Sequence, residues 1–137
     1  MAQERYNNYK NQPIKVVFPS QFDGKKPVRA ADGKTRPKAA IIREKGSNSE
    51  REMANAMYLA GFDVKDVHMT DLISGRETLE DIQFIGTVGG FSNSDVLGSA
   101  KGWAGAFLYN EKAKKALENF FARPDTMSVG ICNGCQL

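Results

Sequence analysis

The residues with the clearest chemical potential lie in one short run near the C-terminal end of the chain. Gly130 and Gly134 flank Cys132 at two positions on either side, within the sequence Gly-Ile-Cys-Asn-Gly-Cys-Gln of residues 130–136. A nucleophile on a sharp strand-to-helix turn needs small neighbours, and this is the spacing of the Gly-x-Ser-x-Gly nucleophile elbow. A helix that begins just after the cysteine directs its first N–H groups at the sulfur, which favours the reactive thiolate. The spacing therefore predicts that Cys132 is a nucleophile.

Attack by such a thiol on a carbonyl group also requires donors for the oxygen that becomes negative. The backbone N–H of Asn133 is expected close to that oxygen, and a second N–H is expected from the Gly89-Gly90 turn. Both segments follow predicted strands of a parallel sheet. Ligands of such sheets bind at the carboxyl ends of the strands, so we expect the two segments to meet there.

The same cysteines allow other interpretations. Cys132 alone is also compatible with a small buried residue, and with Cys135 it forms a C-x-x-C pair of the kind found in redox sites and zinc sites. Two cysteines and one histidine are too few for a four-ligand zinc site within the chain, so no metal is expected. His68 is either a base for Cys132 or a structural residue, and we favour the structural interpretation.

The elements that position these residues are read from the hydrophobic pattern. Short apolar or alternating runs predict buried strands, and apolar residues at helical spacing predict helices between them. Ser47 with Glu50 fits a capping box at the start of the first of these helices. The predicted strands are 39–42, 62–67, 84–88 and 127–131, and the predicted helices are 47–61, 103–108 and 111–121, the last with an apolar face of Ala113, Ala116, Leu117, Phe120 and Phe121. This order predicts an α/β fold with a doubly wound parallel sheet.

The first 36 residues are expected to be an extended linker, with one short strand over residues 14–18. Residues 1–38 carry a net charge of +6 and the remainder −3, which gives the total of +3. A basic segment sometimes binds nucleic acid. Here the lysines are dispersed among Pro and Gly without interleaved aromatic residues, so we expect a solvated surface and no nucleic-acid partner.

The distribution of apolar residues bears on membrane association and location. No apolar run approaches the roughly 20 residues that a membrane helix needs, and the first residues lack the apolar core of a signal peptide. We therefore expect no membrane association and a cytoplasmic location.

Beyond these patterns, residues 36–137 resemble the glutaminase domain at the C-terminal end of the phosphoribosylformylglycinamidine synthase family, a class I glutamine amidotransferase domain. The elbow alone is typical of class I amidotransferases. The other matching segments narrow the resemblance to this family: they are 36–44, 60–63, 66–72, 89–92, 95–98 and 102–104. The resemblance implies a flavodoxin-like fold in residues 37–137, with residues 1–36 as the connector from the synthetase region.

The resemblance also implies roles for individual residues. Cys132 would attack the side-chain carboxamide of glutamine, and Gly90 and Asn133 would supply the oxyanion N–H groups. Phe91, Ser92 and Gln136 would hold glutamine. The released ammonia would pass to the synthetase region, which uses ATP and magnesium to amidate formylglycinamide ribonucleotide in purine biosynthesis; no cofactor is expected within this chain.

The chain also departs from the family pattern. The catalytic histidine and the acidic residue that orients it are expected downstream of the elbow, and Leu137 is the last residue of the sequence. We therefore expect an incomplete domain with little glutaminase activity of its own and an unpaired sheet edge that promotes self-association. Asn93-Ser94 also replaces the Tyr-Gly expected after Gly-Gly-Phe-Ser. The alternative function is a non-catalytic α/β module for binding or assembly.

Overall fold

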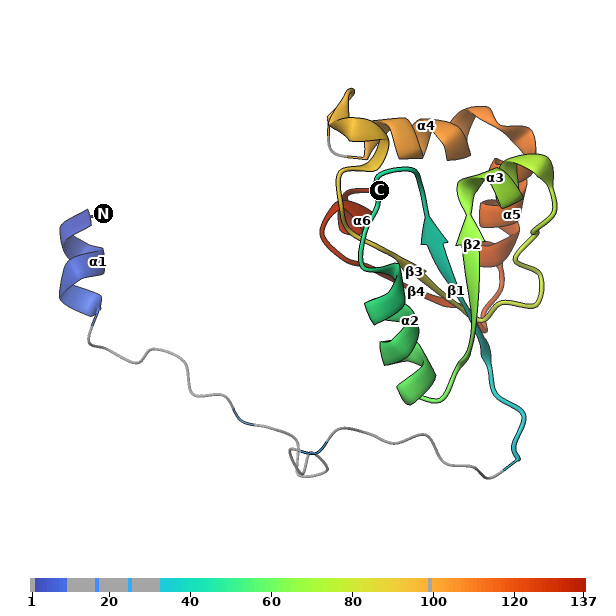
Figure 1. Ribbon diagram of the computed structural model, residues 1–137, viewed down its shortest axis with the longest axis horizontal. Coiled ribbons are helices and arrows are strands. Elements are labelled where there is room, and N and C mark those ends of the chain that lie inside the picture. The colour runs from blue at the N-terminus through green and yellow to red at the C-terminus, as the bar shows by residue number, and fades with distance from the viewer. Residues whose placement is uncertain (1, 10–16, 18–24, 26–32, 99) are drawn as a thin grey trace.

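A computed structural model describes residues 2–9, 17, 25, 33–98 and 100–137 (Figure 1). Within these ranges the chain forms four strands, six α-helices and one 3₁₀-helix. In chain order they are α1 (Ala2–Asn8), β1 (Lys38–Arg43), α2 (Glu50–Leu59), β2 (Asp63–His68), α3 (Met69–Ser74), β3 (Phe84–Thr87), η1 (Ser92–Asp95), α4 (Lys101–Tyr109), α5 (Glu111–Ala122), β4 (Met127–Gly130) and α6 (Asn133–Gln136).

The strands form one parallel sheet in the order β2-β1-β3-β4. These are the first four places of the flavodoxin-like order, in which the strand order reverses between β1 and β3. The predicted strands and the parallel sheet are therefore confirmed. The carboxyl ends of β1 and β3 lie at this reversal point, where sheets of this order bind their ligands. In Figure 1 these ends point toward η1 and α4.

Helices cover both faces of the sheet. On one face, Met57 of α2 packs so closely on β3 that a Cβ added to Gly86 would lie 2.4 Å from its Cε atom. On the other face, Ile42 and Ile85 face Phe107 of α4. Figure 1 shows α2 in front of the sheet and α5 behind it. The sheet is thus doubly wound, and its core consists of buried side chains from both layers, including Ile41, Ile42, Val67, Leu72, Ile85, Trp103 and Phe120.

The N-terminal segment differs from the expected extended linker, because residues Ala2–Asn8 form helix α1. Local interactions explain this: Glu4 lies in the first turn, where a carboxylate is favourable, and the Gln3 side chain donates to Asn7 one turn later over 3.1 Å. None of the residues of α1 is buried. The strand expected over residues 14–18 lies outside the described residues, except for Val17.

The start of α2 also differs from the expected capping box. The N-cap is Ser49, which has a left-handed backbone and no side-chain capping bond. Ser47 instead closes the preceding turn, where its hydroxyl donates to the carbonyl of Glu44 over 2.6 Å. Asn48 then pairs with Gly89, which follows β3, in an isolated antiparallel bridge. The tertiary contact at Asn48 delays the helix until Glu50.

The face predicted for α5 is only partly buried. Ala113, Ala116 and Phe120 are buried, whereas Phe121 is 57% exposed. Phe121 borders an apolar groove of about 380 Å³ between α5 and the sheet, whose other lining residues include Ile42, Ile85, Phe107, Leu117, Val129 and Leu137. The groove lies beside β4, which among the described residues pairs with β3 alone and forms an edge of the sheet.

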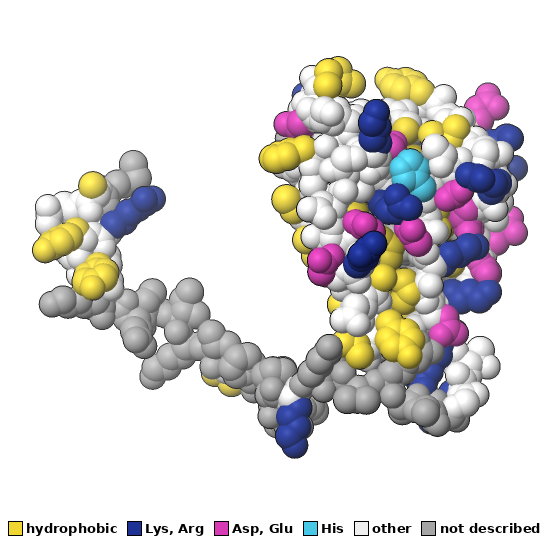
Figure 2. All heavy atoms as spheres, viewed as in Figure 1, with side chains coloured by type: hydrophobic (Ala, Val, Ile, Leu, Met, Phe, Trp, Pro, Cys, Tyr) yellow, Lys and Arg dark blue, Asp and Glu magenta, His cyan; other side chains and the backbone are white. Residues whose placement is uncertain are grey.

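Charged side chains gather over β2 and α3 on the face shown in Figure 2. Lys65 forms an ion pair with the buried carboxylate of Glu77. The pKa of Lys65 lies above its ordinary value, chiefly because its ammonium group donates a hydrogen bond to that carboxylate. Arg43 binds Asp66 on the adjacent strand through two hydrogen bonds of 2.7 and 2.9 Å. These pairs tie β1, β2 and the α3–β3 connection together.

No helix in the described part of the chain is long and apolar enough to cross a bilayer.

Candidate active site

Cys132 lies on the sharp turn between β4 and α6, as the elbow spacing predicts. Its backbone has φ 55° and ψ −114°, a left-handed conformation that is unfavourable for a residue with a side chain. The residue is exposed, so the alternative that it is a small buried residue is wrong. A strained, exposed cysteine at the carboxyl end of a strand is well placed to attack a ligand bound at that edge of the sheet.

The two glycines of the elbow allow the close approach of α6 to the sheet. A Cβ atom on Gly130 would lie 2.5 Å from the carbonyl oxygen of Gly134. A Cβ atom on Gly134 would lie 2.2 Å from the carbonyl oxygen of Thr87 and 2.7 Å from that of Val88. Both contacts are with backbone, which side-chain rotation cannot relieve. The Gly-x-Cys-x-Gly pattern is therefore a packing requirement of this turn.

Hydrogen bonds from the end of β3 hold the elbow in place. The Ile131 N–H donates to the carbonyl of Thr87 over 3.0 Å, and the Thr87 hydroxyl donates to the carbonyl of Gly134 over 2.8 Å. Within the turn, the Cys135 N–H donates to the carbonyl of Cys132 over 3.0 Å. The helix expected after Cys132 is present but has only four residues.

The Gly89-Gly90 turn lies directly against the cysteine. A Cβ atom on Gly89 would be 3.2 Å from Cβ of Cys132 and 3.8 Å from its sulfur. On the other side, the Asn48 N–H donates to the carbonyl of Gly89 over 2.7 Å. The fold thus brings the two glycines and the cysteine to the same edge of the sheet. Gly90 has φ 88°, in the left-handed region, and a Cβ there would meet the Asn48 nitrogen at 2.7 Å.

The two N–H groups expected to bind an oxyanion remain available. Among the described residues, the backbone N–H groups of Gly90 and Asn133 donate to no protein acceptor. By contrast, the Gly134 N–H is already used by the carbonyl of Ile131, at 2.9 Å. Free N–H groups on both sides of a nucleophile match the needs of an oxyanion hole. Their role remains a prediction.

The residues expected to hold a ligand occupy different environments. Phe91 is 73% exposed, and Gln136 is exposed on α6. Ser92 is only 4% exposed, and its hydroxyl oxygen accepts a hydrogen bond of 2.8 Å from the side-chain amide of buried Asn133. Ligand contacts by these residues remain predictions.

His68 has a structural role at the start of α3. Its Nδ1 atom accepts from the Thr70 N–H over 3.2 Å, and the backbone N–H of His68 donates to the Asp71 carboxylate over 3.0 Å. Its Nε2 atom lies 3.9 Å from a carboxylate oxygen of Glu44. These contacts favour the structural interpretation over a base for Cys132. The described residues contain no group of three or more His, Cys, Asp or Glu side chains suited to a metal ion.

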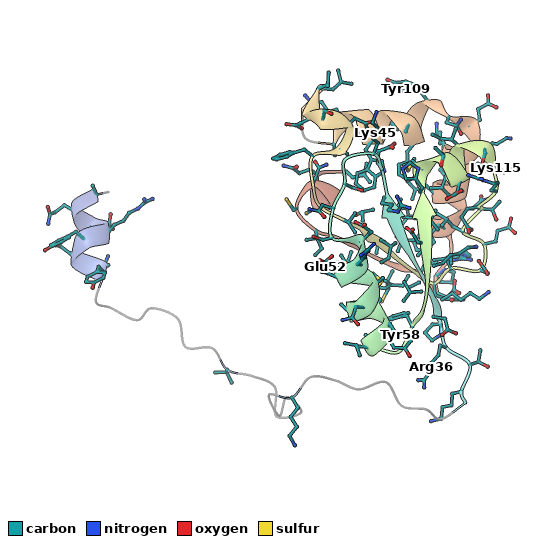
Figure 3. The ribbon with its side chains drawn as sticks, viewed as in Figure 1. Arg36, Lys45, Glu52, Tyr58, Tyr109 and Lys115 are labelled. Atoms are coloured by element: carbon teal, nitrogen blue, oxygen red, sulfur yellow. The ribbon has the colours of Figure 1, made fainter. Side chains whose placement is uncertain are left out.

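The sequence patterns did not identify the loop after β1 as part of the site. The backbone carbonyl of Lys45, a residue labelled in Figure 3, accepts a hydrogen bond of 2.7 Å from the Asn93 N–H. Asn93, Ser94 and Asp95 all have left-handed backbones, with φ between 53° and 56°. Asn and Asp tolerate this conformation better than most residues. In the sequence, only the replacement of the expected Tyr-Gly by Asn93-Ser94 indicated unusual geometry in this loop.

Residues 36–137 match the family described as CobB/CobQ-like glutamine amidotransferase domain. The chain is 58% identical over 103 residues to a Caenorhabditis elegans protein named probable phosphoribosylformylglycinamidine synthase, which covers 75% of the chain and 8% of that protein. It is 56% identical over 101 residues to the human phosphoribosylformylglycinamidine synthase, covering 74% of the chain and 8% of that protein. The chain thus spans about 8% of the length of these curated relatives.

A solved structure shares the fold. The structure of PurLQS from Thermotoga maritima aligns with a TM-score of 0.58 and 27% sequence identity, over 73% of this chain and 42% of that one. The alignment supports the α/β parallel architecture and its helical layers.

Proposed function

The chain belongs to the family of CobB/CobQ-like glutamine amidotransferase domains, and on that premise we propose that it supplies the nucleophile of a glutaminase site. The observation that carries this proposal is the strained, exposed Cys132 against Gly89 at the carboxyl edge of the sheet. An amidotransferase needs a thiol at such a position, because it forms a covalent acyl-enzyme from glutamine.

The proposed reaction proceeds through a thioester. The Cys132 thiolate attacks the side-chain carboxamide carbon of glutamine, and the carboxamide oxygen becomes negative. The N–H groups of Gly90 and Asn133 stabilise that oxygen. Collapse of the intermediate breaks the carbon–nitrogen bond, and the nitrogen leaves as ammonia after taking a proton. Water then cleaves the thioester to give glutamate and the free thiol.

The base that moves these protons is proposed to lie outside residues 36–137. His68 is the only histidine in the sequence, and it caps α3 through Thr70 and Asp71. The 137 residues alone are therefore expected to turn over glutamine slowly, while retaining the thiol and its oxyanion N–H groups.

The curated relatives support a more specific proposal. We propose that the ammonia serves the ATP- and magnesium-dependent amidation of formylglycinamide ribonucleotide in purine biosynthesis, carried out by a synthetase region as in a phosphoribosylformylglycinamidine synthase. The identities of 58% and 56% to proteins of that name support this assignment. Two exposed free thiols are compatible with a reducing compartment, and we propose the cytoplasm.

Selective alkylation tests the glutaminase proposal on the chain itself. A diazo-ketone analogue of glutamine is expected to modify Cys132 and to spare Cys135, because Cys132 lies against Gly89 at the carboxyl edge of the sheet whereas Cys135 lies within α6. Free glutamine is expected to slow the reaction. The measurement is intact mass followed by peptide mapping.

Cys135 provides the matched control, because it is also exposed. Iodoacetamide, which does not resemble glutamine, is expected to modify both cysteines. Equal modification of the two thiols by the glutamine analogue, without protection by glutamine, would contradict the proposal.

The edge of the sheet leads to a proposal about partners. We propose that two copies of the chain associate through β4, whose four residues carry no charge and no proline to prevent pairing. Met127 on this edge is 69% exposed. In sedimentation velocity, the sedimentation coefficient is expected to rise with concentration, and Met127→Lys is expected to abolish the rise.

The control is Tyr109→Lys, which places the same charge at a residue that is 90% exposed at the end of α4 (Figure 3). This variant is expected to associate like the unmodified chain. A monomer at all concentrations, or equal effects of both variants, would disprove pairing through β4.

A further inference from the structure

One buried hydrogen bond joins the loop after β3 to the elbow. The Nδ2 atom of Asn133 donates to the hydroxyl oxygen of Ser92 over 2.8 Å, and the two residues are 3% and 4% exposed. Among the described residues it is the only side-chain hydrogen bond between segments 89–98 and 131–137. Buried polar groups are costly to leave unpaired, so this bond fixes both side chains strongly.

Each end of this bond lies within two residues of one of the two free N–H groups. The Ser92 N–H donates to the carbonyl of Gly90 over 3.0 Å, which makes a tight turn that includes the Gly90 peptide. Asn133 carries the other free N–H on its own backbone. The bond therefore links the two segments that carry these donors.

Both segments need such a restraint because their backbones are strained. Cys132 has φ 55°, and Asn93 and Ser94 next to Ser92 have φ 53° and 56°. Strained backbone persists only where surrounding contacts hold it. An oxyanion hole also tolerates little displacement, since a shift of about 1 Å costs roughly 100-fold in rate.

We propose that Ser92 and the side chain of Asn133 form a clamp that positions the N–H groups of Gly90 and Asn133 for the oxyanion. This inference rests on the proposed glutaminase function and assigns Ser92 a positioning role in place of ligand binding. The clamp is neutral at both ends, so it adds no charge beside the Cys132 thiolate. Its effect is on the transition state, where the oxygen becomes negative.

The first test measures backbone order in the 137-residue chain. In Ser92→Ala, ¹⁵N relaxation is expected to show the order parameters of Gly90 and Asn133 falling from about 0.85 to below about 0.6. Ser92→Thr keeps the hydroxyl and is expected to restore them. Ser74→Ala removes a serine hydroxyl that donates to the Asp71 carbonyl in α3, and it is expected to leave both values unchanged. Unchanged order parameters in Ser92→Ala would overturn the clamp.

The second test measures catalysis in a chimera, in which residues 36–137 replace the matching segment of the human relative. Ser92→Ala is expected to lower kcat for glutamine hydrolysis about 100-fold, which is the loss for a shift of about 1 Å and the lower end of the range for losing an oxyanion donor. KM for glutamine is expected to change little, and Ser92→Thr is expected to recover most of kcat. The double variant Ser92→Ala/Asn133→Ala is expected to be no slower than the slower single variant, because both act through one bond.

The outcomes separate the clamp from the proposed function. A raised KM with unchanged kcat would overturn the positioning role, because it would mean that Ser92 contacts glutamine. Additive losses in the double variant would also overturn it. A chimera without any Cys132-dependent glutaminase activity would instead refute the proposed function, and the order parameters would then decide on the clamp alone.

Discussion

Cys132→Ala is expected to remove glutamine hydrolysis from the chimera that carries residues 36–137 in the human relative. Loss of a nucleophile that forms a covalent intermediate costs at least about 10⁴-fold in kcat. Synthesis from added ammonium salt is expected to continue, because external ammonia bypasses the thiol. The measurements are glutamate release and amidine formation in parallel assays.

Cys135→Ala is the matched control for this variant. Cys135 is a second exposed thiol three residues away, within helix α6, whose N-cap is Cys132. Its replacement is expected to leave glutamate release within a few-fold of the parent chimera. Retained glutaminase activity in Cys132→Ala would show that another group carries the reaction.

Gly134→Ala is expected to have the largest effect on folding. The new Cβ would stand 2.2 Å from the carbonyl oxygen of Thr87 and 2.7 Å from that of Val88. Relief requires a shift of α6 or β3, so the free energy of unfolding is expected to fall by about 2–3 kcal/mol, the upper range for overpacking. The measurement is urea unfolding followed by circular dichroism.

Gly105→Ala is the matched control, because Gly105 lies within α4 and its Cβ would meet no atom closer than 3.8 Å. Alanine is the better helix former, so this variant is expected to gain up to about 1 kcal/mol. Equal stability of both alanine variants would contradict the packing account of the elbow. In Gly134→Ala, the displaced α6 is also expected to slow the modification of Cys132 by the glutamine analogue.

Much of the scaffold follows from local sequence. Apolar runs such as 39–42 and 84–88 are short, flanked by turn residues and separated by helical spacing, which predicts buried parallel strands with crossover helices. The structure confirms that sheet. Where the prediction was wrong, at the start of α2, a contact between Asn48 and Gly89 prevailed over the local capping pattern. Asn48 and Gly89 are far apart in the sequence, so a local pattern does not predict their contact.

The sequence by itself determined that Cys132 follows a strand and has a glycine two positions away on either side. These are local properties, because they depend only on the order of neighbouring residues and on the fact that glycine has no side chain. Only the tertiary structure decided that Cys132 adopts φ 55°, that Gly89 lies against it, and that Ser92 is buried under Asn133. These features depend on how the ends of β3 and β4 pack together. The reason is physical: a local pattern states which conformations a residue tolerates, whereas contacts between distant segments select one of them.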